Sequence, residues 1–261
     1  MRSVAALFRR AAVSVLFAAL LGLSPAQAAP KYCDTERDNV VIYIDTTTPY
    51  DEIDKQALVD GVSRIFESLE GGERFSVRTI ADSFPTSRSL IDACVPFCKS
   101  NGFFEDLLNA SCTEGVMLND RKHLSNEVVR QLESLLRDFV ELPYSEIVRT
   151  VALSSQTEWR SQQRNRLYLF TDLIENSAYL PGKDFFSVKN DKLLGRLKDD
   201  GLIPPLSGAD VRVFGVGRGG NPGDRHPLDQ NLLGKLTDFW TRYFDAAGAS
   251  LSIQQSLGAV D

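Results

Sequence analysis

Histidine is scarce in this sequence, and the short motifs of common enzymes are missing. His123 and His226 are far apart and neither has neighbours of ligand type, which argues against a histidine-based metal centre or catalytic base. There is no Gly-x-Ser-x-Gly motif, as serine hydrolases of that type require. The glycine-rich stretch at 215–220 lacks the spacing of a phosphate-binding loop, and we expect Arg218 within it to be solvated. We therefore predict a protein that is not an enzyme.

Long hydrophobic runs are also missing, apart from one near the amino terminus. Residues 1–28 combine a basic start, a 13-residue mostly apolar run and the small-residue site Ala26-Gln27-Ala28, which is the pattern of a signal peptide. The run is shorter than the about 20 residues that a membrane-spanning helix needs. We expect cleavage before Ala29 and a periplasmic or secreted mature chain, residues 29–261, without a transmembrane segment.

Positive charge is in deficit. Three of the 29 lysines and arginines lie in the predicted leader. The mature chain therefore has 26 basic and 35 acidic residues, for a net charge of −9. An acidic surface argues against nucleic acid or an anionic membrane as the partner. It is compatible with a partner protein.

Only four cysteines are present, Cys33, Cys94, Cys98 and Cys112, and all of them follow the leader. An even number in an oxidising compartment favours two disulfides, with three pairings open. Zinc is the alternative, but Cys94 and Cys98 lack a second close pair of cysteine or histidine ligands.

Strand and helix patterns alternate along the chain. Val40–Ile44 is a continuous apolar run, typical of a strand covered on both faces, and helical spacing follows it from Ile53 to Gly71-Gly72. Further strands are expected at 74–81, 87–94, 167–170 and 209–220, and helices at 124–142, 145–159, 191–201 and 232–249, with Ser125 and Ser145 as helix caps. This order predicts an α/β fold: a three-layer, doubly wound, mainly parallel sheet with one antiparallel edge strand. We expect a single domain with an irregular cysteine-containing insertion at about 94–122.

Carboxylates and hydroxyls follow two of the predicted strands. Asp45-Thr46-Thr47-Thr48 comes directly after the first strand, and Thr171-Asp172 comes after the strand at 167–170. Ligands of such sheets bind at the carboxyl ends of the strands. The two aspartates are therefore candidate site residues.

These segments resemble the von Willebrand factor type A (VWA) domain. That family carries Asp-x-Ser-x-Ser after its first strand, where this chain has Asp45-Thr46-Thr47-Thr48-Pro49, and a later threonine at a helix start, where this chain has Ser145. Its last element is Thr-Asp-Gly, which corresponds to Thr171-Asp172-Leu173. The likeness extends over roughly 39–249, and the closing stretch FWTRYFDAAGA resembles a secreted bacterial subset of the family.

The resemblance implies a protein-binding module with a metal-ion-dependent adhesion site. Mg²⁺ or Mn²⁺ would be held by the hydroxyls of Thr47 and Ser145 and by Asp45 and Asp172, and would accept an acidic side chain from a partner protein. Pro49 has no side-chain oxygen, so Thr48 is a possible substitute for the missing ligand. Leu173 also departs from the family's glycine. We describe the site as degenerate, with weaker metal binding or none.

Other roles for the same residues stay open. Asp45 and the threonines are suited to capping a helix near Asp51, and Ser145 to capping its own helix, which would leave a metal-free scaffold of a periplasmic or envelope assembly. A phosphatase with an aspartate nucleophile needs a second carboxylate where Thr47 stands. A hydrolase is therefore the least favoured function.

Overall fold

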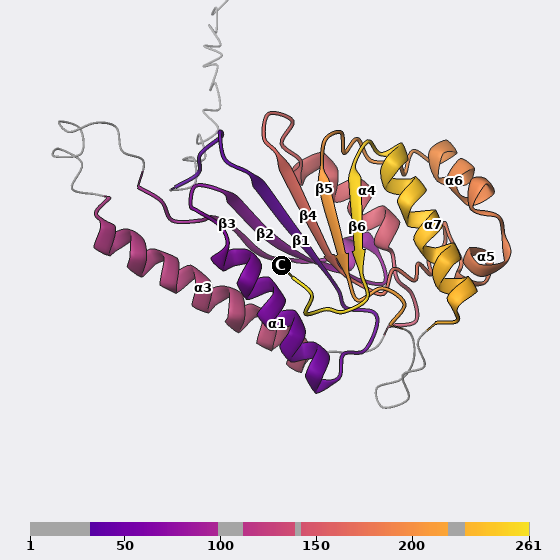
Figure 1. Cartoon of the computed structure of the whole chain (residues 1–261), viewed down its shortest axis with the longest axis horizontal. Helices are drawn as coiled ribbons and strands as arrows, with labels where there is room; N and C mark the ends of the chain where they lie inside the picture. Colours follow the sequence, from indigo (N-terminus) through magenta and orange to yellow (C-terminus); the bar gives the residue numbers. More distant parts are fainter. Residues whose placement is uncertain (1–31, 99–111, 139–141, 219–227, 261) are drawn as a thin grey trace, which may run out of the picture.

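The fold is built on one six-stranded sheet. The computed structural model describes residues 32–98, 112–138, 142–218 and 228–260 (Figure 1), so the predicted signal peptide lies outside the described residues. The strand order is β3-β2-β1-β4-β5-β6. β3 pairs antiparallel with β2, and all other neighbours are parallel. The predicted α/β class, with one antiparallel edge strand, is confirmed.

The elements follow one another in the alternating order that the sequence predicts. The strands are β1 (Asn39–Asp45), β2 (Arg74–Ile80), β3 (Ser89–Cys94), β4 (Asn165–Phe170), β5 (Asp210–Phe214) and β6 (Ser250–Gln254). The helices are α1 (Glu52–Glu67), α3 (Glu114–Arg137), α4 (Ile147–Glu158), α5 (Gly182–Ser187), α6 (Asn190–Asp199) and α7 (Gln230–Ala246), with a short 3-10 helix, η1 (Phe84–Thr86). Within the described ranges, no helix is both long enough and apolar enough to cross a membrane.

Two apolar cores lie on opposite faces of the sheet. Val40, Ile42 and Ile44 belong to the core that α1 and α3 cover, whereas Val41 and Tyr43 belong to the core that α4 and α7 cover (Figure 1). Successive strand side chains point to opposite faces, so the continuous apolar run of β1 supplies both cores. Each large side chain buried in this way contributes about 1.5–3 kcal/mol.

Two sequence expectations about the segment around the start of α3 were wrong, and one strand was missed. The helix expected from residue 124 begins at Glu114, where the Thr113 side chain accepts a hydrogen bond from the Val116 N–H, so Ser125 lies inside α3 and is not its cap. Residues 114–122 are therefore helical, and not part of an irregular insertion; residues 99–111 of that insertion lie outside the described residues. The edge strand β6 was not predicted at all. Its five residues alternate between exposed and half-buried, which is a weak signal in so short a segment.

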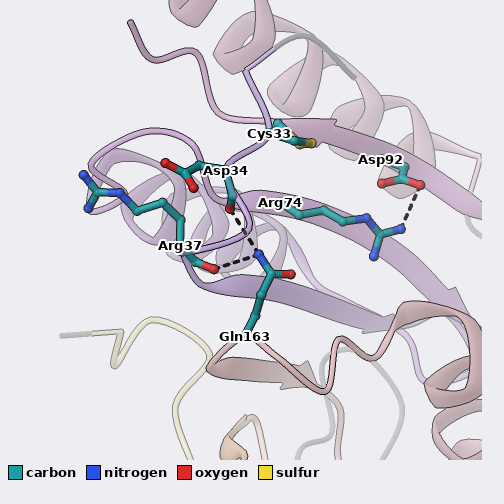
Figure 2. The surroundings of a disulfide bond; sticks show 7 residues. Cys33, Asp34, Arg37, Arg74, Asp92 and Gln163 are labelled. Atoms are coloured by element: carbon teal, nitrogen blue, oxygen red, sulfur yellow. Dashed lines mark hydrogen bonds and ion pairs between the residues drawn. A yellow bond between two sulfur atoms is a disulfide. The ribbon is translucent and has the colours of Figure 1, made fainter. Parts of the chain in front are cut away.

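Two disulfides hold the amino-terminal segment and the start of α3. Cys33 pairs with Cys94 and Cys98 with Cys112, with Cα–Cα separations of 5.1 Å and 5.6 Å. The expected number of disulfides is confirmed, and the open pairing is now assigned. Figure 2 shows Cys33 at the amino-end edge of the sheet, where the Gln163 side-chain amide donates to the carbonyls of Asp34 and Arg37. The segment before β1 is thus fixed by covalent and hydrogen bonds together.

Candidate functional site

The candidate site lies where the sheet changes its direction of winding. β1 and β4 are neighbours in the sheet, and β1 leads through α1 to β2 on one side while β4 leads through α5 and α6 to β5 on the other. The crevice at the carboxyl ends of two such strands is the usual ligand position in doubly wound sheets. Asp45 ends β1 and Asp172 follows β4, so the structure brings both predicted aspartates to this position.

Asp45 is fully buried and its carboxylate is held by hydroxyl groups. Oδ1 accepts from the Thr47 hydroxyl at 2.6 Å and from the Thr47 N–H at 2.9 Å, and Oδ2 accepts from the Thr171 hydroxyl at 2.6 Å. The turn after β1 therefore folds back on its own strand end. Asp45 does not accept a bond from the first turn of α1, which Asp51 caps instead. The alternative role for Asp45, as the cap of that helix, was wrong.

Asp172, which follows the neighbouring strand β4, also has both carboxylate oxygens hydrogen-bonded. Its Oδ2 accepts from the Thr48 hydroxyl at 2.6 Å, and its Oδ1 accepts from the Ile174 N–H at 2.8 Å. Thr48 thus joins the β1 loop to the β4 loop. We call Asp45, Thr47, Thr48, Thr171 and Asp172 the acidic centre.

Leu173 occupies the position of the family's glycine and keeps a glycine-like backbone. Its φ is 62°, a left-handed conformation that favours glycine. Two contacts hold it there: the Leu173 N–H donates to the Thr171 hydroxyl oxygen, and the Trp240 indole N–H donates to the Leu173 carbonyl at 2.9 Å. The leucine side chain is buried in the core under α7. The turn after Asp172 is thus held by hydrogen bonds at both the N–H and the carbonyl of Leu173.

Burial has the largest effect on the pKa values of the two aspartates in the acidic centre. Desolvation raises the pKa of Asp45, while the hydroxyls of Thr171 and Thr47 oppose that rise. Desolvation, together with the neighbouring charge of Asp45, raises the pKa of Asp172 to about 7. Two carboxylates close together in a buried site cannot both ionise freely. The acidic centre therefore holds less than two full negative charges near neutral pH.

Arg218 is buried beside these carboxylates, contrary to the expectation that it is solvated. Its side chain is 8% exposed, Nη1 lies 3.0 Å from Oδ2 of Asp54, and Cζ lies 4.1 Å from the centre of the Tyr50 ring. The positive charge of Arg218 opposes the burial-driven rise in the pKa of both Asp45 and Asp172. Sequence reasoning missed Arg218, Asp54 and Tyr50. One available signal was the position of Arg218 in a loop after a buried strand, at the same edge of the sheet.

Ser145 lies at the same edge of the sheet, but its hydroxyl is not hydrogen-bonded to the predicted aspartates. Its backbone forms an isolated β-bridge with Asn176, and its buried hydroxyl has no hydrogen-bond partner in the part of the chain that the structure describes. We expected Ser145 to cap α4, and the structure shows that it does not. Oε2 of the buried Glu175 accepts instead from the N–H groups of Ile147 and Val148, the first two residues of α4. Thr47 and Thr48 join the aspartates, whereas Ser145 makes no hydrogen bond to them.

The residues present fit a divalent cation poorly. The hydroxyls of Thr47 and Thr48 donate to the carboxylates with which they would have to share a metal ion. Pro49 offers no side-chain oxygen, and Arg218 places a positive charge beside the same carboxylates. Among the described residues, no group of three or more His, Cys, Asp or Glu side chains is arranged to hold a metal ion. Binding of Mg²⁺ or Mn²⁺ stays a prediction.

Comparisons with known proteins give distant structural likeness only. No family model and no curated protein matches the sequence. A von Willebrand factor type A structure from Catenulispora acidiphila is 12% identical, with a TM-score of 0.46, and the match covers 86% of this chain and 40% of that one. Proximal thread matrix protein 1 from the mussel byssus is 14% identical, with a TM-score of 0.42 and coverage of 89% and 46%. The chain spans less than half the length of either protein.

The arrangement of this chain agrees with its sequence resemblance. The mainly parallel sheet, its antiparallel edge strand and the aspartates after β1 and β4 are the features that the VWA resemblance implies. The α/β class of the sheet is confirmed, and the VWA resemblance itself stays a prediction.

Proposed function

We propose that this chain is an exported protein-binding module that recognises its partner at the carboxyl-end edge of the sheet. The proposal is supported by where the exposed apolar side chains lie. Large hydrophobic residues exposed among the described residues are Ile53, Val116, Leu118 and Tyr144. Ile53 is 78% exposed in the first turn of α1, next to Asp54, and Tyr144 is 56% exposed next to Ser145. Exposed aromatic residues such as tyrosine are enriched at protein interfaces, so these two side chains are candidate anchors for a partner.

The chemistry of the acidic centre favours binding over catalysis. Each of its four carboxylate oxygens accepts a hydrogen bond from the chain, and both carboxylates are buried. A catalytic base or nucleophile must reach a substrate atom at hydrogen-bond distance. The acidic centre is instead suited to fixing the loops after β1 and β4, on which a partner would dock. The negative net charge makes a nucleic acid an unfavourable partner.

Removing the exposed apolar side chains at this edge should weaken partner binding by about tenfold or more, because buried aromatic and aliphatic anchors supply much of the binding energy of an interface. The measurement uses tagged residues 29–261 to capture partners from envelope extract of the native cells. The captured protein is then titrated against wild type and against the double variant Ile53→Ser, Tyr144→Ser.

The matched control is the double variant Val116→Ser, Leu118→Ser, which removes two exposed hydrophobic residues from α3. It should bind the partner as wild type does. Equal loss in both double variants, or no loss in the first, would contradict recognition at the carboxyl-end edge. The partner could be recognised with the help of a metal ion, or by a metal-free scaffold. Adding a chelator separates these two alternatives: binding that persists favours the metal-free scaffold, and binding that is lost favours metal-assisted recognition.

A further inference from the structure

A buried arginine in an acidic centre needs an explanation, because burying an unpaired charge is costly. Among the described residues, Arg218 forms its ion pair with Asp54, whose side chain is 10% exposed. Its Nε and Nη2 groups are buried and have no hydrogen-bond partner within the described ranges. Asp54 therefore uses only part of the guanidinium. The positive charge of Arg218 also acts on the nearby carboxylates of Asp45 and Asp172.

The backbone fixes Arg218 close to Asp172. The Gly217 N–H donates to the Asp172 carbonyl at 3.1 Å, so Arg218 is one residue away from a direct link between the β5 loop and the β4 loop. Gly215 and Gly217 have φ values of 92° and 71°, which allow the chain to turn back over this edge after β5. A Cβ on Gly215 would lie 2.7 Å from Cδ2 of Leu257, and one on Gly217 would lie 3.0 Å from Cδ1 of Leu233. This turn therefore depends on glycine.

The loop after β1 contacts the guanidinium of Arg218 through the ring of Tyr50. Tyr50 lies under Arg218, with Cζ 4.1 Å from the ring centre, and the Tyr50 hydroxyl donates to the Asp45 carbonyl at 2.7 Å. A guanidinium over an aromatic face is attracted by the ring as well as by carboxylates. Arg218 is thus bound to the β1 loop through Tyr50 and to α1 through Asp54. The cation is placed among the three segments that carry Asp45, Asp54 and Asp172.

We propose that the guanidinium of Arg218 takes the place of the divalent cation at this site, so that the acidic centre is complete without metal. Arg218 pairs directly with Asp54, and its permanent positive charge also acts on the carboxylates of Asp45 and Asp172. The hydroxyls of Thr47 and Thr48, which would otherwise be available as metal ligands, donate to the carboxylates. A second cation at this position would be repelled by Arg218.

This inference goes beyond the proposed function, because it concerns how the site is held together and not what binds to it. Its first test contains no partner protein, so the two proposals can fail separately. Wild-type protein, residues 29–261, is titrated into Mn²⁺ while the electron paramagnetic resonance signal of free Mn²⁺ is recorded. We expect no loss of signal up to millimolar protein, and the same melting temperature in Mg²⁺ as in chelator. One Mn²⁺ bound per chain in wild type, and lost in Asp45→Asn, would overturn the proposal.

Variants then test the charge itself. Arg218→Gln leaves the aspartates without a counter-charge, so its melting temperature should fall by about 5 °C or more and be partly restored by millimolar Mg²⁺ or Mn²⁺. Arg218→Lys keeps the charge, and should be more stable than Arg218→Gln and insensitive to metal. The matched control is Arg242→Gln, which removes an arginine that pairs with Asp238 and Asp191 at the surface.

Arg242→Gln should change the melting temperature little and should not respond to metal. A folded Arg218→Gln protein that responds to Mn²⁺ no more than wild type does would show that Arg218 does not replace a cation. If Arg218→Gln does not fold, Arg218→Lys and the wild-type titration decide the matter. A lysine variant that is as unstable as the glutamine variant would overturn the charge argument.

Discussion

Replacing Cys33 and Cys94 together by serine is expected to lower the free energy of unfolding by about 4 kcal/mol. The two cysteines are 61 residues apart, and a cross-link over so long a stretch removes much of the entropy of the unfolded chain. The native contacts of the segment remain, including the hydrogen bonds from the Gln163 amide to the carbonyls of Asp34 and Arg37 (Figure 2). The measurement is urea unfolding of both proteins under non-reducing conditions.

The second disulfide provides the matched control for this prediction. Cys98 and Cys112 are 14 residues apart, so the same relation gives about 3 kcal/mol for the Cys98→Ser, Cys112→Ser variant. Cys94 pairs in register with Arg74, the first residue of β2, which places the Cys33–Cys94 disulfide at the amino-end edge of the sheet. Partner binding at the opposite edge should survive its removal. A smaller loss for the long link than for the short one would contradict the entropic explanation.

The fold was predictable from sequence because its strongest signals are local. The apolar run of β1 is short and rich in β-branched residues, which favours a strand covered on both faces, and the spacing of apolar residues in α1 marks a helix with one buried side. The start of α3 was hidden because the apolar residues of its first turns, Val116, Met117 and Leu118, are consecutive and not at helical spacing, and two of them are exposed. β6 was hidden because five residues at the edge of a sheet are buried on one face only. Each error lies where tertiary packing, and not local pattern, decides the structure.

The site was predictable to the same extent. Asp45, Thr47 and Thr48 lie within four residues of one another in sequence, and Asp172 follows a strand that was correctly predicted and that the structure places beside β1. The ion pair between Arg218 and Asp54 joins residues 164 positions apart, and no local pattern indicates it. A charged residue in a glycine-rich loop is ordinarily solvated, so the sequence alone favours the wrong environment for Arg218. The pairing of Arg218 with Asp54 is therefore visible only in the folded chain.

Glu175→Ala is expected to lower the free energy of unfolding by about 2–4 kcal/mol, because it would leave two N–H groups at the start of α4 unpaired. Oε2 of Glu175 accepts from the N–H of Ile147 at 2.8 Å and from that of Val148 at 3.0 Å, and the glutamate is fully buried. Glu175→Gln keeps an oxygen acceptor of the same reach and should lose much less. Urea unfolding of the two variants at one pH measures the difference. Equal losses would show that the helix cap is not what Glu175 provides.

The same residue makes stability depend on pH. Burial raises the pKa of Glu175 from its usual 4.5 to about 8, and burial together with Asp45 raises that of Asp172 to about 7. Both acids keep their protons to higher pH in the folded chain than in the unfolded chain. The folded chain therefore binds more protons between about pH 4.5 and pH 8, and stability is greatest at the acidic end of this range and falls as the pH rises.

Wild type should lose stability between about pH 5.5 and pH 8, by up to about 1.4 kcal/mol for each unit of raised pKa that the range crosses. The amino terminus of α4 favours the ionised carboxylate of Glu175, so the fall is smaller than burial alone would give. Glu175→Gln cannot ionise, and its stability should fall less steeply over the same range, with the Asp172 contribution remaining. Urea midpoints at several pH values test this. Parallel curves for the two proteins would mean that Glu175 is already ionised throughout, held by the N–H groups of α4.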